Sequence, residues 1–180
     1  MEERYSFESL GEQHLGLRAT FSCGEDALDR YLRERARREM EQRIAAVRVL
    51  YDGKENRLAG YYTLSAVAIE RGDLRSAFTH RVAKYRVYPA TLIGRLAVDR
   101  EYQDQRLDGS LLLDALARAL DASRQVASLA IITDAKDEAA QSFYEHYGFQ
   151  LLPTDRHDRR LFLPMGTVER LFAGYEICRP

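Results

Sequence analysis

The sequence has 180 residues, which is enough for one domain in which helices cover a sheet. Hydrophobic residues make up 46% and charged residues 31%, as in an ordinary folded protein, and no apolar run reaches the length that a membrane span needs. The net charge of −1 and the sequence pI near 6.4 argue against a protein dedicated to nucleic acid, and they allow only local basic patches.

The N-terminus and the cysteines indicate a cytoplasmic protein. The first ten residues, MEERYSFESL, lack the basic start and the apolar stretch of a signal peptide. We therefore expect Cys23 and Cys178 to be free thiols in a reducing compartment. The four histidines are scattered, so no metal site is expected.

The first half of the chain predicts a strand, a helix and a long hairpin. Tyr5–Leu10 is a short strand, and Glu25–Gln42 is a helix whose early acidic residues suit the positive end of its dipole. Ile44–Tyr51 and Arg57–Ile69 are strands joined by a turn at Asp52 and Gly53. The apolar residues at helical spacing in the helix are Leu28, Tyr31, Leu32 and Ala36.

The second half begins with an irregular basic segment, Glu70–Pro89, and then alternates strands with helices. Such alternation predicts parallel pairing, whereas the earlier hairpin predicts antiparallel pairing. We therefore expect one α/β domain over residues 1–180, with a mixed central β-sheet and helices on both faces. The expected elements are strands Thr91–Asp99, Ala127–Thr133, Phe149–Leu152 and Arg159–Leu163, and helices Asp108–Ser123 and Glu138–Tyr147, the last ending at Gly148.

Three segments resemble the acetyl-CoA-binding core of the GNAT superfamily of N-acetyltransferases. They are Gly94–Gln103 (GRLAVDREYQ), Leu107–Leu116 (LDGSLLLDAL) and Asp134–Phe149 (DAKDEAAQSFYEHYGF). Further segments are similar to the GNAT toxins of bacterial toxin–antitoxin pairs, so the resemblance covers nearly the whole chain in the right order. These segments are Phe21–Leu32 (FSCGEDALDRYL), Gly60–Ser65 (GYYTLS) and Arg160–Met165 (RLFLPM).

The resemblance implies where acetyl-CoA binds. The strand that ends near Asp99 is expected to splay from its neighbour and to offer backbone groups to the pantetheine amides. After this strand the family uses Gln/Arg-x-x-Gly-x-Gly/Ala, where glycines let the backbone approach the pyrophosphate and helix N–H groups hold it. The implied cofactor-binding residues are Leu96, Ala97, Val98, Gln103, Asp104, Arg106, Asp108, Gly109 and Ser110.

The chain departs from this pattern in the pyrophosphate loop. Arg106 and Asp108 occupy the two signature glycine positions, and Asp104 occupies a further glycine position of the toxin branch. Each added carboxylate near the pyrophosphate costs about 1 kcal/mol at a surface. Asp108 is expected to cap its own helix, whereas Arg106 offers a compensating charge. Two interpretations stay open: acetyl-CoA binding is retained but weakened, or it is lost.

The resemblance implies that Tyr144 is the catalytic residue. It would supply the proton that the departing thiolate needs, and the alternative is a tyrosine that only packs. Phe143 and Phe149 are expected in the core. No clear general base is evident, and Asp99 and Glu101 are expected to be solvated loop residues.

Basic residues supply candidate RNA contacts. The face of Arg30, Arg33 and Arg37 is interleaved with acids and is expected to be a solvated, salt-bridged surface. Two denser clusters remain as candidates for substrate contact. The substrate candidates are Arg81, Lys84, Arg86 and Arg159, with Arg156 and Arg160 beside the last.

The resemblance predicts an acetyltransferase toxin. It would transfer acetyl from acetyl-CoA to the α-amino group of an aminoacyl-tRNA and so block translation. Such toxins pair with a ribbon-helix-helix antitoxin and often form homodimers. One alternative is a degenerate GNAT-fold protein that binds or regulates without acetyl-CoA. Another is an acetyltransferase for a small amine or a protein amine, which the nearly neutral charge suits.

Overall fold

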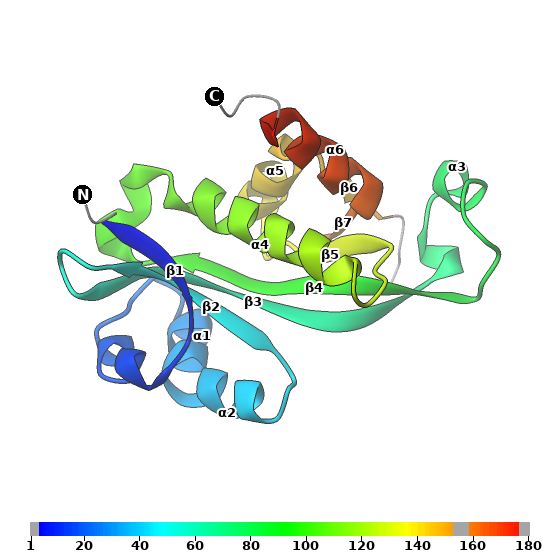
Figure 1. The fold of residues 1–180 in the computed structure, drawn as a ribbon. Helices are drawn as coiled ribbons and strands as arrows, with labels where there is room; N and C mark the ends of the chain where they lie inside the picture. Colours follow the sequence, from blue (N-terminus) through cyan, green and yellow to red (C-terminus); the bar gives the residue numbers. More distant parts are fainter. Residues whose placement is uncertain (1–3, 153–158, 177–180) are drawn as a thin grey trace. The chain divides into compact units, whose positions relative to one another are not determined.

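The computed structural model describes residues 4–152 and 159–176. In this described part, seven strands form one sheet in the order β1-β2-β3-β4-β5-β7-β6 (Figure 1). The strands are β1 (Tyr5–Ser9), β2 (Ala46–Asp52), β3 (Arg57–Glu70), β4 (Val87–Val98), β5 (Ala130–Asp134), β6 (Gln150–Leu151) and β7 (Arg160–Pro164). The longer helices are α1 (Asp26–Arg30), α2 (Ala36–Glu41), α4 (Leu107–Ser123), α5 (Glu138–His146) and α6 (Met165–Glu176).

Short helical segments complete the chain. A π-helical turn, η3 (Tyr31–Arg35), joins α1 to α2, so the predicted helix forms with a bulge in its middle. The remaining segments are η1 (Glu12–His14), η2 (Leu17–Ala19), η4 (Arg71–Asp73), α3 (Ser76–Thr79) and η5 (Arg100–Gln105).

The sheet is mixed, as the sequence predicts. β2 pairs antiparallel with β1 and with β3, and β4 pairs parallel with β5. β7 then pairs antiparallel with both β5 and β6. The last two strands therefore lie in the sheet in the reverse of their order in the chain, because β7 rather than β6 lies next to β5.

The chain divides into two compact units. The first contains Met1–Ser65 and Gly94–Ala115, and the second contains Ala66–Ile93 and Leu116–Pro180. Domain boundaries usually fall in exposed linkers. Here they fall inside β3, β4 and α4, and we therefore propose that the two units belong to one domain.

Helices cover both faces of the sheet in the first unit. Tyr61 and Tyr62 are neighbours on β3, so their side chains point to opposite faces. The Tyr61 hydroxyl donates to the Leu28 carbonyl of α1 at 2.8 Å, and the Tyr62 hydroxyl bonds to Asp114 of α4 at 2.5 Å. The predicted two-sided arrangement is confirmed within this unit (Figure 1).

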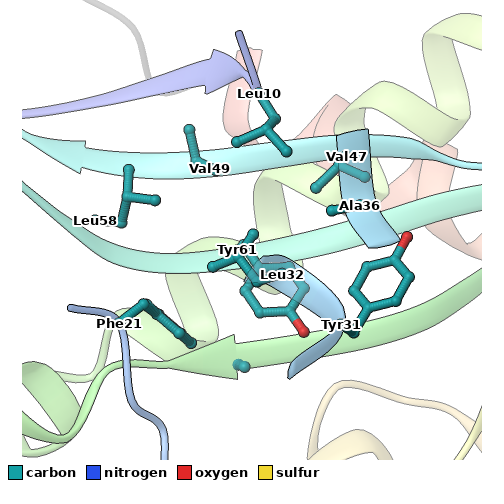
Figure 2. Packing of buried hydrophobic residues seen from close by; sticks show 10 residues of the cluster. Leu10, Phe21, Tyr31, Leu32, Ala36, Val47, Val49, Leu58 and Tyr61 are labelled. Atoms are coloured by element: carbon teal, nitrogen blue, oxygen red, sulfur yellow. The ribbon is translucent and has the colours of Figure 1, made fainter. Parts of the chain in front are cut away.

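The core of the first unit is rich in aromatic side chains (Figure 2). Tyr31 stacks on Tyr61 with ring centroids 6.2 Å apart, and Phe21 meets Tyr61 edge-on at 5.5 Å. Leu32 and Ala36 are fully buried beside them. The helical spacing of these apolar residues in the sequence is therefore the spacing that buries them.

The second unit has its own core. Phe78 of α3 meets Phe162 of β7 edge-on at 5.5 Å, and Ala130 and Ile132 of β5 lie in the same cluster. Ile131 alternates with them and is also fully buried, so β5 is covered on both faces. This explains why the ASLAIIT stretch is almost continuously apolar.

Most element boundaries differ from the sequence prediction by a few residues, and three differences are larger or of another kind. Glu70–Pro89 is not irregular throughout, since it contains η4, α3 and the start of β4. β5 begins at Ala130, and the Leu129 backbone before it bonds to the backbones of Pro89 and Met165. The helix α6 was not predicted, although Met165 and Val168 are buried at a helical spacing.

Gly60 marks the closest approach of β3 to α4. A Cβ atom at this position would lie 2.7 Å from Leu111 Cδ1 and 2.9 Å from the Ala97 carbonyl oxygen. Because the carbonyl belongs to the backbone, we expect Gly60→Ala to lower the free energy of unfolding by about 1–3 kcal/mol. Urea denaturation measures this change. Gly16→Ala is the matched control, since its Cβ meets nothing within 4 Å, and equal effects of both changes would contradict the packing argument.

Candidate functional site

The pairing of β4 with β5 stops before either strand ends. It covers three residue pairs, of which Ile93 with Thr133 is the last. The Thr133 hydroxyl donates to the Ile93 carbonyl at 3.1 Å and closes this end of the ladder. β4 then runs on from Gly94 to Val98 beyond its register with β5. This extension is where the sequence predicts backbone groups that receive an amide-bearing ligand.

Tyr144 lies in α5 beside the end of that ladder. Its side chain is buried, and its hydroxyl is hydrogen-bonded with Thr133. Burial raises the pKa of the Tyr144 phenol. The phenol therefore stays protonated at neutral pH, as a proton donor must.

Aromatic rings hold the Tyr144 side chain. Phe149 and Phe143 meet it edge-on, with ring centroids 5.4 Å and 5.2 Å away. Phe149 is buried as predicted, whereas Phe143 is only half-buried. These contacts restrict the ring to one orientation, which leaves the hydroxyl as its reactive end.

Local signals in the sequence fix both ends of α5. The Asp137 side chain caps the helix by accepting from the Ala140 N–H at 2.8 Å. Gly148 has a φ of +90° and follows the helix end, as the sequence predicts. The position of Tyr144 on the helix therefore follows from two short-range capping signals.

Asp99, which follows β4, is not the solvated residue that the sequence predicts. It is 2% exposed, and its carboxylate accepts from the Ser22 N–H at 2.9 Å and from the Glu101 N–H at 3.0 Å. The second bond caps η5, the segment that occupies the cofactor-loop positions. Glu101 is exposed and forms an ion pair with Arg57.

Gln103 is committed to the protein itself. Its side-chain amide donates to the Cys23 carbonyl at 2.9 Å and to the Val98 carbonyl at 3.2 Å. It thereby ties η5 to the end of β4. We propose that Gln103 acts on the cofactor by holding the loop.

Cys23 is half-buried, and burial raises the pKa of its thiol to about 11, with the hydrogen bond to Asp29 acting in the same direction.

Arg106 adopts a backbone conformation that favours glycine. Its φ is +56° and its ψ is +29°, which is the left-handed region, and its side chain is exposed. A residue other than glycine there costs about 1–2 kcal/mol. The loop therefore turns through the left-handed region at position 106 without the residue that adopts this region most readily.

Asp108 is not an N-cap, so that prediction is wrong. α4 begins at Leu107, and Asp108 is already its second helical residue. An N-cap residue must lie outside the helix with an extended backbone, and Arg106 occupies that place without an acceptor side chain. Asp108 still favours the helix through the dipole, by about 0.3–1 kcal/mol.

A buried carboxylate at the end of β2 holds η5, the segment at the cofactor-loop positions, through Tyr102. Asp52, at the end of β2, is 0% exposed and accepts from Arg4 at 2.8 Å and from the Tyr102 hydroxyl at 3.0 Å. The N–H groups of Lys54 and Glu55 also bond to it. Burial opposes ionisation, but these hydrogen bonds outweigh it and hold the pKa of Asp52 below its usual range.

The first unit brings together nearly all elements that an acetyl-CoA site requires. The backbone of Leu96, Ala97 and Val98 continues beyond the β5 register, and the first N–H groups of α4 have no partner within the helix. Arg106 adds an exposed positive charge beside them. Gly109 is buried in the first turn and Ser110 is exposed. The exposed carboxylate of Asp104 opposes an anion, but the remaining groups fit a pyrophosphate and an amide chain.

The predicted substrate residues separate into two kinds. Arg81, Lys84 and Arg86 are exposed, whereas Arg159 is half-buried. Arg160 is a structural residue, since it forms two 2.7 Å hydrogen bonds with Asp134. Arg156 lies outside the described residues.

The helix face of Arg30, Arg33 and Arg37 is exposed, as the sequence predicts. Arg37 forms ion pairs with Glu41 at 2.8 Å and with Glu12 at 3.4 Å. The interpretation as a solvated, salt-bridged surface is therefore confirmed for Arg37.

Sequence reasoning missed the groups that hold the loop. The sequence identifies Asp52 only as a turn residue and Tyr102 only as part of the segment Gly94–Gln103. Both belong to contacts between residues about fifty positions apart, which leave no local signal. Tyr102 itself, a large ring four residues after the end of β4, is the one hint in the sequence that this segment has a buried anchor.

The described residues contain no helix that is long and apolar enough to span a membrane. Nor do residues 4–152 and 159–176 hold a group of three or more His, Cys, Asp or Glu side chains that could bind a metal ion.

Comparison with known families and proteins gives a consistent result. The family described as "Acetyltransferase (GNAT) domain" matches residues 41–151. The chain is also 33% identical to a tRNA-acetylating toxin of Mycobacterium tuberculosis over 136 residues. That match covers 76% of this chain and 80% of the toxin.

Solved structures of two further proteins match nearly the whole chain. A tyrosine-to-phenylalanine mutant of KacT has a TM-score of 0.87 and 30% identity, and the match covers 94% of this chain and 100% of that one. AtaT complexed with acetyl-methionyl-tRNAfMet has a TM-score of 0.85 and 30% identity, covering 93% and 99%. A mutant AtaT bound to the C-terminus of the antitoxin AtaR and to acetyl-CoA has a TM-score of 0.77 and 28% identity, covering 94% and 99%.

The low pKa of Asp52 gives a prediction for stability against pH. A carboxyl group whose pKa is lower in the folded state stabilises the protein above its unfolded pKa, near 3.9, and this contribution is lost as the pH falls. We expect Asp52→Asn to lower the free energy of unfolding at pH 7 by about 1–3 kcal/mol, and the difference to shrink below about pH 4.

Denaturant titrations at several pH values measure this difference. Asp121→Asn is the control, because Asp121 is 75% exposed and pairs only with exposed Arg124, so its loss should be close to neutral. An Asp52→Asn protein as stable as the wild type at pH 7 would show that the carboxylate is not the anchor described above.

Proposed function

The chain belongs to the GNAT acetyltransferase family, and we propose that it is a toxin that acetylates the α-amino group of an aminoacyl-tRNA. The acetyl donor is acetyl-CoA. The product can no longer take part in peptide-bond formation through that amine, so translation stops.

The hydrogen bond of Tyr144 at the end of the β4–β5 ladder is the observation that carries this proposal. It places a protonated phenol where two parallel strands stop pairing. The relatives support the choice of substrate. One is a tRNA-acetylating toxin, and another was solved with acetyl-methionyl-tRNA.

The chemistry needs one positioned proton donor. Acetyl-CoA supplies the acetyl group as a thioester, and the amine of the acceptor forms a bond to its carbonyl carbon while the carbon–sulfur bond breaks. We propose that Tyr144 gives its hydroxyl proton to the departing thiolate, that the acylated amine loses its surplus proton to water, and that water then reprotonates Tyr144. The bond with Thr133 keeps the hydroxyl in place, since the Thr133 residue is itself fixed by Ile93.

The backbone of Leu96, Ala97 and Val98 is the proposed site for the pantetheine. For the pyrophosphate, we propose the loop that includes Gln103 and Asp104, the side chain of Arg106, and the first turn of α4 with Asp108, Gly109 and Ser110. The left-handed Arg106 supports retained binding, because the loop keeps the shape of a phosphate-binding turn. The two carboxylates support binding that is weaker than in a relative with glycines.

The proposal extends to partners and location. Arg81, Lys84, Arg86 and Arg159 are the proposed contacts for the tRNA backbone. A relative was solved with the C-terminus of an antitoxin, and we propose that an antitoxin of the ribbon-helix-helix type binds this chain. We also propose a cytoplasmic location, since charged tRNA is the substrate, and a homodimer, since the GNAT toxins that the chain resembles often form one.

Tyr144→Phe tests the role of the phenol. The change removes only the hydroxyl, so we expect the fold to remain and kcat for acetyl transfer to charged tRNA to fall about 10²–10⁴-fold. The measurement is transfer of radiolabelled acetyl to aminoacyl-tRNA. Tyr147→Phe is the matched control at the end of the same helix and should keep its activity. Wild-type rates in Tyr144→Phe would mean that Tyr144 only packs.

The altered loop gives a second test. We expect the triple change Asp104→Gly, Arg106→Gly and Asp108→Gly to tighten acetyl-CoA binding, because it removes two carboxylates and relieves a left-handed arginine. The gain should shrink as salt rises, since part of it is electrostatic. Calorimetric titration with acetyl-CoA at low and high salt measures both effects.

A double variant separates charge from conformation. Asp104→Gly with Asp108→Gly retains Arg106, so tighter binding by the double than by the triple variant would assign a phosphate contact to Arg106. If the wild type binds acetyl-CoA as tightly as both variants, the carboxylates do not weaken the site. Wild-type transfer to a small or protein amine but not to charged tRNA would instead favour an acetyltransferase with another acceptor.

A further inference from the structure

An exposed tyrosine lies among cations in the segment that connects α3 to β4. Tyr85 is 65% exposed, and Val87 beside it is 43% exposed. Arg81, Lys84 and Arg86 are exposed around them. We call residues 81–87 the basic aromatic segment. Single exposed apolar side chains are common on protein surfaces, so Tyr85 and Val87 matter here for their place among the cations.

The basic aromatic segment is held in place at both ends. Val82 packs against the core of the second unit. Tyr88 is 4% exposed, and its hydroxyl donates to the Ala83 carbonyl at 2.8 Å and accepts from Arg71 at 3.2 Å. The Tyr85 N–H also bonds to the Ala83 carbonyl, at 3.1 Å. The Tyr85 ring is therefore presented from a closed turn, edge-on to Tyr88.

The cations of this segment are not neutralised locally. Residues 74–98 contain no Asp or Glu, although the chain as a whole carries a net charge of −1. Within the described ranges, no carboxylate lies within 4.0 Å of Arg81, Lys84 or Arg86. Other arginines of the chain, such as Arg37 and Arg160, do have acidic partners. Among the residues that the structure describes, the segment is thus a positive surface without an acidic partner, with an aromatic ring in its middle.

Such a surface fits a single-stranded nucleic acid. Cations bind the phosphates, and an exposed ring offers a face on which an unpaired base stacks. A duplex offers its phosphates but no free base face, since its bases are already stacked. The amino acid of a charged tRNA is carried on a single-stranded 3′ end, which supplies both groups close to the reacting amine.

We infer that the basic aromatic segment binds the single-stranded 3′ end of the charged tRNA, with a base stacked on Tyr85 and phosphates at Arg81, Lys84 and Arg86. This inference rests on the proposed function and adds the mode of recognition. Charge favours a polyanion over a protein partner as the occupant, because residues 81–87 expose three cations and one ring and contain no acidic residue.

Direct binding tests the inference without catalysis. The probes are a labelled single-stranded RNA of about ten nucleotides and a blunt RNA duplex of similar length, measured by fluorescence anisotropy. We expect Tyr85→Ala to weaken single-strand binding about 5- to 150-fold and Tyr85→Phe to bind like the wild type. Ile44→Ala, another exposed apolar side chain in the first unit, should change nothing. Arg81→Gln with Lys84→Gln should reduce the salt dependence of binding to both probes.

Kinetics separates this inference from the proposed function. With charged tRNA, Tyr85→Ala should raise KM by a similar factor and leave kcat unchanged. With an aminoacyl-adenosine fragment, which lacks the upstream nucleotides, the same variant should react like the wild type. If the wild type acetylates neither substrate, the proposed function fails, and the binding measurements still decide the inference.

Two results would overturn the inference. One is single-strand RNA binding by Tyr85→Ala that equals the wild type. The other is a Tyr85→Ala variant that binds RNA normally but differs from the wild type in oligomeric state, measured by sedimentation. That result would show that a second copy of the chain covers the ring. Tyr85 is exposed, so loss of the fold is not expected, and circular dichroism verifies this.

Discussion

The position of the cofactor loop depends on a carboxylate that has no contact with water. The Asp52 carboxylate accepts hydrogen bonds from the Arg4 side chain, from a backbone N–H of the β2–β3 turn, and from the Tyr102 hydroxyl of η5. An ionised group in this position is stable only if all of its partners are present. The three segments therefore have to assemble together, and the loop that follows β4 cannot take another path while Asp52 stays charged.

Asp99 and Gln103 hold the other side of the same loop. Asp99 connects it to Ser22, and Gln103 connects it to Cys23 and Val98. With both sides held, the backbone at position 106 lies in the left-handed region although the residue is an arginine. This explains how an arginine can occupy a glycine position. The surrounding contacts impose the conformation, and the cost of about 1–2 kcal/mol is small against their sum.

The sequence predicts features that depend on short-range patterns. The alternation of strand and helix from Thr91 onward, the end of α5 at Gly148 and the burial of Phe149 all follow from local patterns, and the structure has them. The sequence does not reveal Asp52 as an anchor or Asp99 as a buried cap, because their partners lie far along the chain. Asp108 shows the converse error. An aspartate before an apolar run is typical of an N-cap, but the helix begins one residue earlier because Arg106 has already turned the chain.

The link between Cys23 and Gln103 has a consequence for the chemistry of the thiol. At pH 7, a thiol with a pKa of about 11 is ionised in about one molecule in ten thousand, and oxidants attack the ionised form. An ordinary cysteine is ionised in a few molecules per hundred at the same pH. The cysteine whose carbonyl holds the cofactor loop is therefore less prone to oxidation than an ordinary exposed thiol. The contact that holds the loop depends on the backbone of this residue, so it does not require a reactive side chain.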